Sequence, residues 1–189
     1  MEKRIALEGI DGCGKTVVAN AIADSLNSQQ IATRVVSPFR LASQALGHNI
    51  YDLWRRDDDA STAIKALHHA LEIVEFEAVR DEIEVVLFDR HWMTAFTEIE
   101  GRPDLVAAWG DNFVPAAQLV CAPLEAHRRL RNDMEAEWST LNAQSDYAIK
   151  FGQLAHRYPE RMLGIYRSND DVTVGSLARQ IEWDMNIRR

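Results

Sequence analysis

Residues 9–16, with the sequence GIDGCGKT, constrain the fold more than any other part of the chain. They match the pattern G-x-x-x-x-G-K-[ST]. The apolar residues 4–8 before the match favour a buried strand, and residues 17–26 after it place apolar side chains at helical spacing. A strand, a glycine-rich turn and the start of a helix together form a nest of backbone N–H groups that attracts phosphate. The segment therefore predicts a phosphate-binding loop.

The side chains of this loop carry separate expectations. The glycines allow the backbone to approach an anion closely. Lys15 is expected to reach the outer phosphates of a nucleotide, and the Thr16 hydroxyl to bind Mg²⁺. The residues expected to bind the nucleotide here are Gly9, Asp11, Gly12, Cys13, Gly14, Lys15 and Thr16.

Short apolar segments alternate with helical ones along the chain. Strands are predicted at residues 4–8, 32–36, 83–88, 116–121 and 171–174, and helices at residues 16–27, 41–54, 62–80, 124–138, 147–157 and 176–185. Such alternation indicates βαβ crossovers and a parallel sheet covered on both faces. The predicted fold class is α/β: a P-loop NTPase fold with a five-stranded parallel sheet flanked by helices, in a single domain over residues 1–189.

The composition disfavours several classes of partner. A formal net charge of -8 makes nucleic acid an unsuitable partner. No apolar run approaches the ~20 residues that cross a bilayer, so no membrane partner is expected. The first residues lead directly into the first predicted strand, so no signal peptide is expected. Cys13 and Cys121 provide neither a disulfide framework nor metal spacing. We expect a cytoplasmic enzyme with a small-molecule nucleotide substrate.

The third predicted strand ends at a second polar motif, Asp89-Arg90-His91. A carboxylate at the end of a strand beside a phosphate loop can reach the Mg²⁺ that bridges the outer phosphates. Asp89 is placed for that role, and it could also cap the following helix, which is compatible with metal binding. Arg90 could hold an anionic acceptor through its bidentate guanidinium.

These two motifs resemble those of the thymidylate kinase family of nucleoside monophosphate kinases. The family typically reads FEGxDGxGKST, then DRY or DRH followed by S-x-x-A-Y. This chain reads LEGIDGCGKT at residues 7–16 and DRH at residues 89–91, followed by Thr-Ala-Phe at residues 94–96. The resemblance implies that ATP and Mg²⁺ are bound, that Asp11 approaches the acceptor sugar, that Arg90 meets the acceptor phosphate and that Asp89 serves the metal. Many members of the family are homodimers, and the oligomeric state of this chain stays open.

The resemblance also implies a helical lid, at about residues 124–145, after the fourth predicted strand. An arginine of a closed lid can place positive charge on the oxygens of the transferring group. We rank the candidates Arg128, then Arg131, then Arg129. Gly175 and Ser176 follow the fifth predicted strand, where the adenine ring lies in these kinases. The residues expected to take part in catalysis are Lys15, Asp89, Arg90, Arg128 and Arg131.

The acceptor side departs from the family pattern. Phe39 and Arg40 follow the second predicted strand, where these kinases carry an arginine near the acceptor. The arginine that holds thymine in the family is absent between residues 62 and 79, and residues 97–101 read TEIEG in place of a glutamine-containing loop. The residues expected to bind the acceptor are Asp11, Phe39, Arg40 and Arg90. The acceptor expected is dTMP or a related, modified deoxypyrimidine monophosphate.

Two other functions stay open at this point. A deoxynucleoside kinase uses a neutral hydroxyl as acceptor and commonly a glutamate near the end of the second strand, and another small-molecule kinase stays open on the same evidence. Residues 35–41 contain no carboxylate and carry Arg40, which favours a phosphorylated acceptor. A non-catalytic nucleotide-binding protein is the other alternative, since fold analogy alone does not establish turnover.

Overall fold

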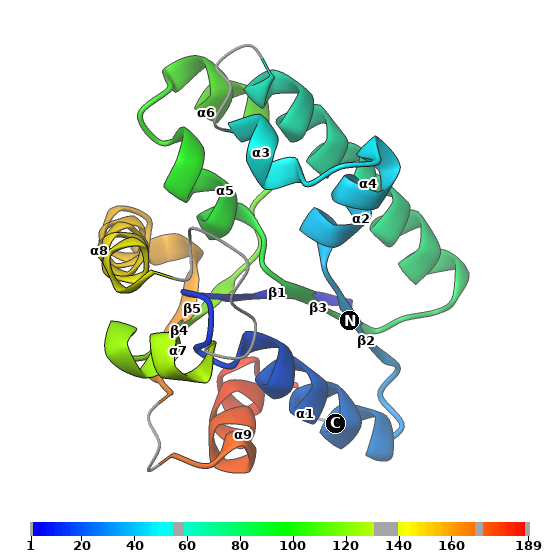
Figure 1. Ribbon diagram of the computed structural model, residues 1–189. Helices are drawn as coiled ribbons and strands as arrows, with labels where there is room; N and C mark the ends of the chain where they lie inside the picture. Colours follow the sequence, from blue (N-terminus) through cyan, green and yellow to red (C-terminus); the bar gives the residue numbers. More distant parts are fainter. Residues whose placement is uncertain (1, 55–58, 131–139, 169–171, 188–189) are drawn as a thin grey trace.

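The computed structural model describes residues 2–54, 59–130, 140–168 and 172–187, and it has an α/β architecture (Figure 1). The strands are β1 (Lys3–Glu8), β2 (Thr33–Val36), β3 (Val85–Asp89), β4 (Ala116–Val120) and β5 (Met162–Arg167). The helices are α1 (Lys15–Ser28), α2 (Pro38–Leu46), α3 (Ile50–Trp54), α4 (Ala60–Arg80), α5 (Trp92–Ile99), α6 (Pro103–Trp109), α7 (Pro123–Arg129), α8 (Leu141–Arg157) and α9 (Val174–Asp184). A short 3₁₀ helix (Pro159–Arg161) precedes β5.

Within the described residues the strands form one five-stranded parallel sheet in the order β2-β3-β1-β4-β5. In β1 and β3, Ile5 pairs with Leu87 and Leu7 pairs with Asp89. The chain leaves β1 toward β2 and β3 on one side and later returns to β4 on the other, so the order reverses at β1. Ligands of open α/β sheets bind beyond the carboxyl ends of the strands at such a point. The loop of residues 9–14, which follows β1, lies there.

Helices cover both faces of the sheet, as parallel sheets require. Figure 1 shows α1 and α9 on one side and α2, α4 and α5 on the other. The central strands are correspondingly apolar: residues 85–88 of β3 are buried without interruption. The largest fully buried side chains include Trp92, Phe96 and Trp109, which form an aromatic cluster on the α5 side of the sheet. This cluster fixes α5 beside the carboxyl ends of the strands.

The helices begin and end where the local sequence favours it. Pro38, Pro103 and Pro123 stand at the first positions of α2, α6 and α7, where a missing N–H costs nothing. Gly47 ends α2 in the left-handed region, at φ 73°. The helix predicted over residues 41–54 is therefore wrong in its extent: helix α2 ends before Gly47, and α3 follows as a separate helix.

The predicted fifth strand, at residues 171–174, is also wrong. The fifth strand is β5, Met162–Arg167; α9 begins at Val174, directly after Thr173, and residue 171 lies outside the described residues. Thr173 caps that helix, because its hydroxyl accepts a hydrogen bond from the Ser176 N–H at 3.2 Å. A β-branched residue at a cap resembles a strand residue in sequence, and β-branched Val172 and Val174 flank this one. Helix α6 was not predicted.

None of the described helices combines the length and the apolar character needed to cross a membrane.

Candidate active site

The loop between β1 and α1 is held by two neighbouring elements. Gly9, Gly12 and Gly14 have φ values of 137°, 79° and 91°, in the region that favours glycine. A Cβ at Gly9 would lie 2.3 Å from the carbonyl oxygen of Leu119 in β4. A Cβ at Gly12 would lie 2.4 Å from the carbonyl oxygen of Ala126 in α7. Both positions therefore need glycine for its conformation and for its lack of a side chain.

Lys15 points into the loop from the first turn of α1. Its side chain is 5% exposed, and its Nζ donates hydrogen bonds to the carbonyl oxygens of Gly9 at 2.9 Å and Ile10 at 2.8 Å. Asp11 Oδ1 lies 3.9 Å from the same ammonium group. The ammonium group can exchange these carbonyl partners for the oxygens of a bound phosphate, which carry more negative charge.

Thr16 and Asp89 meet beside the loop. The Thr16 hydroxyl donates a hydrogen bond to Asp89 Oδ2 at 2.5 Å. The other carboxylate oxygen, Oδ1, is buried and has no hydrogen-bond partner among the described residues. A buried carboxylate oxygen without a donor is costly, and a cation would satisfy it. The pair therefore fits Mg²⁺, which takes few protein ligands and completes its shell with phosphate oxygens and water.

No group of three or more His, Cys, Asp or Glu side chains in the described part of the chain could hold a metal ion. A divalent cation here would thus depend on Thr16 and Asp89 together with a phosphate-bearing ligand. This is the arrangement expected when a metal ion is bound together with a phosphate-bearing ligand.

Arg90 follows Asp89 in an unusual backbone conformation. Its φ is 75°, and its N–H donates to the Leu7 carbonyl oxygen at 3.1 Å. The guanidinium forms an ion pair with Asp11, in the loop. Burial lowers the pKa of Arg90, and the negative charge of Glu8 opposes that effect. The β1–β3 pairing and this conformation direct the guanidinium toward the loop.

Glu8, the last residue of β1, is fully buried and supports the start of α5. Its Oε1 accepts hydrogen bonds from the N–H groups of His91 at 2.8 Å and Met93 at 3.0 Å. Its Oε2 accepts from the Thr94 hydroxyl at 2.7 Å. Burial raises the pKa of Glu8, while these hydrogen bonds from Thr94 and His91 oppose the rise. A carboxylate at a helix N-terminus is stabilised there, so Glu8 ties α5 to the end of β1.

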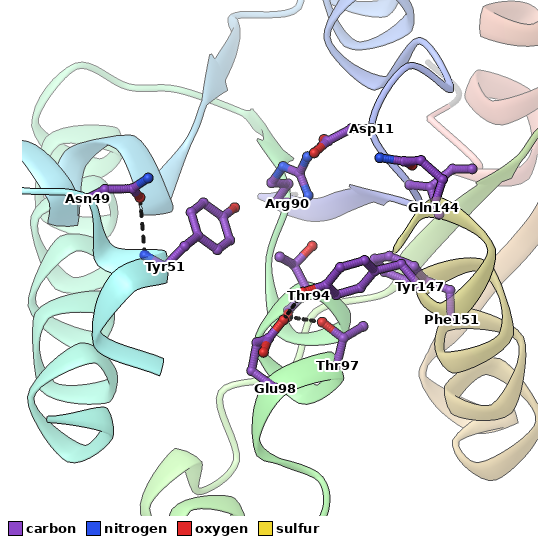
Figure 2. A pocket seen from close by; sticks show the side chains of 11 residues that line it. Asp11, Asn49, Tyr51, Arg90, Thr94, Thr97, Glu98, Gln144, Tyr147 and Phe151 are labelled. Carbon is purple, nitrogen blue, oxygen red and sulfur yellow. Dashed lines mark hydrogen bonds and ion pairs between the residues drawn. The ribbon is translucent and has the colours of Figure 1, made fainter. Parts of the chain in front are cut away.

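A pocket of about 240 Å³ opens beside Arg90 (Figure 2). Its walls come from the loop after β1, from Arg90, from α5, from α8, and from α3 with Asn49 just before it. Burial raises the pKa of Tyr51 in this wall, so its phenol stays protonated. The lining residues are Ile10, Asp11, Asn49, Tyr51, Arg90, Thr94, Thr97, Glu98, Gln144, Tyr147 and Phe151.

Phe39 and Arg40 stand apart from this pocket. Phe39 is buried and stacks on Tyr51, with ring centroids 5.4 Å apart, so it supports the wall from behind. Arg40 is exposed on α2 and does not line the pocket. The structure thus brings Asp11 and Arg90 together and leaves Arg40 outside.

The arginines of the expected lid differ in their contacts. Arg129, which we ranked last, directs Nη1 to the Gly12 carbonyl oxygen at 3.4 Å and Nε to Glu125 at 3.1 Å. Arg128 is 62% exposed and lies 3.8 Å from Glu125. Arg131 lies outside the described residues. Of the two described arginines, Arg129 is therefore the one in contact with the loop.

The C-terminal side of the loop is held by a residue that the sequence did not single out. Ser168 follows β5, and its hydroxyl donates to the Cys13 carbonyl oxygen at 2.7 Å. Cys13 itself is fully buried. Gly175 and Ser176 lie exposed in the first turn of α9. They therefore belong to a helix, whereas the sequence predicted that they follow the end of a strand.

The helical wall of the pocket was also missed. Thr94, Thr97 and Glu98 recur at the spacing of one helix face within α5, which is otherwise apolar. Gln144, Tyr147 and Phe151 do the same in α8. Polar residues on an apolar helix are the signal that could have found the first set.

His91 gives the site region a testable pH dependence. Its side chain is 3% exposed, and burial lowers its pKa from 6.5 to about 3. Below pH 6.5 His91 becomes protonated in the unfolded chain but stays neutral in the folded chain. The free energy of unfolding should therefore fall as the pH falls. The expected loss from this site is about 2 kcal/mol at pH 5 relative to neutral pH. His91→Phe, which keeps a ring against Phe88 and Trp109, should remove it.

Urea unfolding of both proteins at pH 7 and pH 5 measures this difference. The raised pKa of Glu8 acts in the opposite direction, and comparison of the two proteins at the same pH cancels it. An identical loss in the two proteins would show that His91 is not the group responsible.

Comparison of the sequence with models of protein families and with curated proteins gave no match.

Proposed function

We propose that this protein is a P-loop kinase that transfers a phosphoryl group from ATP to a nucleoside monophosphate. The observation that carries the proposal is the Thr16–Asp89 pair at 2.5 Å, with the second Asp89 oxygen buried and unpartnered. This pair stands at the N-terminus of α1, behind a loop of three left-handed glycines that encloses the Lys15 ammonium. Such a loop attracts phosphate, and the pair suits the metal that accompanies it.

Each residue has a distinct role in the proposed reaction. Lys15 and the N–H groups of the loop would bind the outer phosphates of ATP, and Thr16 and Asp89 would hold Mg²⁺. The metal, when bound, neutralises charge on the transferring group. Arg90 would orient the acceptor phosphate, and Asp11, its ion-pair partner, would meet the acceptor sugar. Phosphoryl transfer requires little covalent chemistry from the protein, so positioning and charge supply most of the rate.

The adjacent pocket supports an acceptor of nucleotide character. It begins at Arg90 and Asp11 and continues between α5 and α8. Tyr51 and Phe151 supply aromatic surface, and Thr94 supplies a hydroxyl. A ring with a phosphate at one end matches this combination of an aromatic wall and a terminal cation. Deoxypyrimidine monophosphates are the acceptors to test first.

The experiment measures ADP formation by the full-length protein with Mg²⁺-ATP and a panel of nucleoside monophosphates and the matching nucleosides. We expect turnover with a deoxypyrimidine monophosphate and none with the nucleosides. Asp89→Asn serves as the control that removes metal binding. Turnover with nucleosides alone would indicate a deoxynucleoside kinase. ATP binding without turnover of any acceptor would indicate a non-catalytic nucleotide-binding protein.

Arg129 should contribute more to this reaction than Arg128. Its guanidinium already contacts the loop at Gly12, so it can reach the transferring group with little movement. We expect Arg129→Ala to lower kcat by roughly 10²-fold, the usual loss for one electrostatic donor. Arg128→Ala is the matched control, since Arg128 is largely exposed and shares the partner Glu125. Steady-state kinetics that show the larger loss for Arg128→Ala would reverse the assignment.

A further inference from the structure

Glu98 places a carboxylate at the end of the pocket away from the phosphate loop. It lies on α5 one turn beyond Thr94, which is about 6 Å along the helix at 1.5 Å per residue. Figure 2 shows Arg90 and Asp11 on one side of the pocket, Glu98 on the other, and Thr94 between them. A molecule whose phosphate is held at Arg90 would therefore turn its opposite end toward Glu98.

The carboxylate is oriented by the neighbouring helix. The Tyr147 hydroxyl of α8 donates a hydrogen bond to Glu98 Oε1 at 2.5 Å. Lys150 donates to the Thr97 carbonyl oxygen at 2.8 Å, and its Nζ lies 5.1 Å from the centre of the Tyr147 ring. These contacts link α5 and α8 across the pocket. Because Tyr147 uses one oxygen of Glu98, the other oxygen is the natural acceptor for a ligand.

A carboxylate discriminates between the polar groups of a ring. An ionised carboxylate only accepts hydrogen bonds, so one that faces position 4 of a pyrimidine favours an amino group there and disfavours a carbonyl oxygen. The cost of leaving a polar group unpaired in a closed site makes such discrimination large. Thymine and uracil carry a carbonyl oxygen at position 4, where cytosine carries an amino group. The difference falls on the edge of the ring opposite the sugar.

We propose that Glu98 selects an acceptor that presents an amino group at this end of the pocket, so that an aminopyrimidine monophosphate is preferred over one of the uracil or thymine type. This inference rests on the proposed kinase function and names the substrate class of the same site. The amino group donates to Glu98, the phosphate meets Arg90, and the ring lies against Phe151 and Tyr51.

The test uses dCMP and dUMP, which differ in the group at position 4 and in the hydrogen on the ring nitrogen at position 3. For the unaltered protein we expect kcat/KM for dCMP to exceed that for dUMP by at least about tenfold. In Glu98→Gln the ratio should fall toward one, because an amide can donate as well as accept. Glu72→Gln, an exposed glutamate on α4, is the matched control and should keep the ratio of the unaltered protein. Preference for dUMP, or a ratio that Glu98→Gln leaves unchanged, would overturn the proposal.

Binding measured without ATP separates this inference from the proposed function. Calorimetric titration with dCMP and dUMP should give the same order of affinities and the same effect of Glu98→Gln. If both monophosphates turn over at equal rates and bind equally, the role of Glu98 is wrong while the kinase assignment survives. If neither yields ADP but dCMP alone binds, and Glu98→Gln abolishes that preference, Glu98 has the proposed selectivity and the kinase assignment fails.

Discussion

Lys15→Ala is expected to lower kcat for the proposed phosphoryl transfer by roughly 10²- to 10³-fold, the range for loss of one preorganised charge donor. The ammonium group lies inside the loop, within 3 Å of two backbone carbonyl oxygens, and a bound phosphate would take their place. Alanine removes the charge from the point where negative charge develops in the reaction. Single-turnover measurement of ADP formation with saturating Mg²⁺-ATP and acceptor gives the change in the chemical step directly.

The fold should survive this substitution. Lys15 contacts the carbonyl oxygens of the loop, which water can reach once the side chain is shortened, and it contributes nothing to the aromatic cluster. Circular dichroism and thermal unfolding should therefore change little in Lys15→Ala. Lys65→Ala, at an exposed position of α4, controls for the loss of one positive charge. Full turnover by Lys15→Ala would reject the phosphate-loop assignment.

Gly9→Ala is expected to destabilise the protein by roughly 3 kcal/mol, because backbone strain and steric overlap act together. The new Cβ would lie 2.3 Å from the Leu119 carbonyl oxygen, at a φ of 137°. The contact is with backbone of a central strand, which cannot turn aside as a side chain can. The loop or β4 must move, and nucleotide binding should weaken as well.

Thermal unfolding measures this effect, with an expected fall in Tm of about 6–12 °C for a chain of this size. Gly101→Ala is the matched control, because nothing lies within 4 Å of the added Cβ and its φ is ordinary. The control should stay within about 0.5 kcal/mol of the unaltered protein. Equal Tm values for Gly9→Ala and Gly101→Ala would show that the loop yields more easily than its packing indicates.

The sheet could be predicted from sequence where burial alone decides the structure. Residues 85–88 form a continuous apolar run, which indicates a strand buried on both faces, and the parallel sheet followed from the alternation of such runs with helices. The edge strand β5 lacks that signal: it contains Gly164 and exposes Ile165. A strand was predicted at residues 171–174 because residues 172–174 are all β-branched. A threonine at a helix cap cannot be distinguished from a threonine in a strand by residue type alone.

The candidate site also has a part that could be predicted from the sequence and a part that could not. The positions of the glycine-rich loop of residues 9–14 and of Asp89 could be predicted, because these residues are adjacent in sequence or stand at strand ends. The pocket could not be predicted, because α3, α5 and α8 come together only through tertiary packing. Arg128 and Arg129 are neighbours in sequence, and only the direction of α7 relative to Gly12 distinguishes them.

Under the proposed function, the loop glycines and the Thr16–Asp89 pair would differ in how long they persist among related sequences. Gly9 and Gly12 are fixed by the backbone of β4 and α7, so a descendant that lost its chemistry would still be selected to keep them in order to fold. Thr16 is exposed, and its hydrogen bond to Asp89 adds little to the packing of the core. Mutations would therefore remove that pair first in a lineage no longer selected for the proposed activity. Retention of the hydroxyl and the carboxylate, more than the glycine signature itself, should mark the lineages in which the reaction is still under selection.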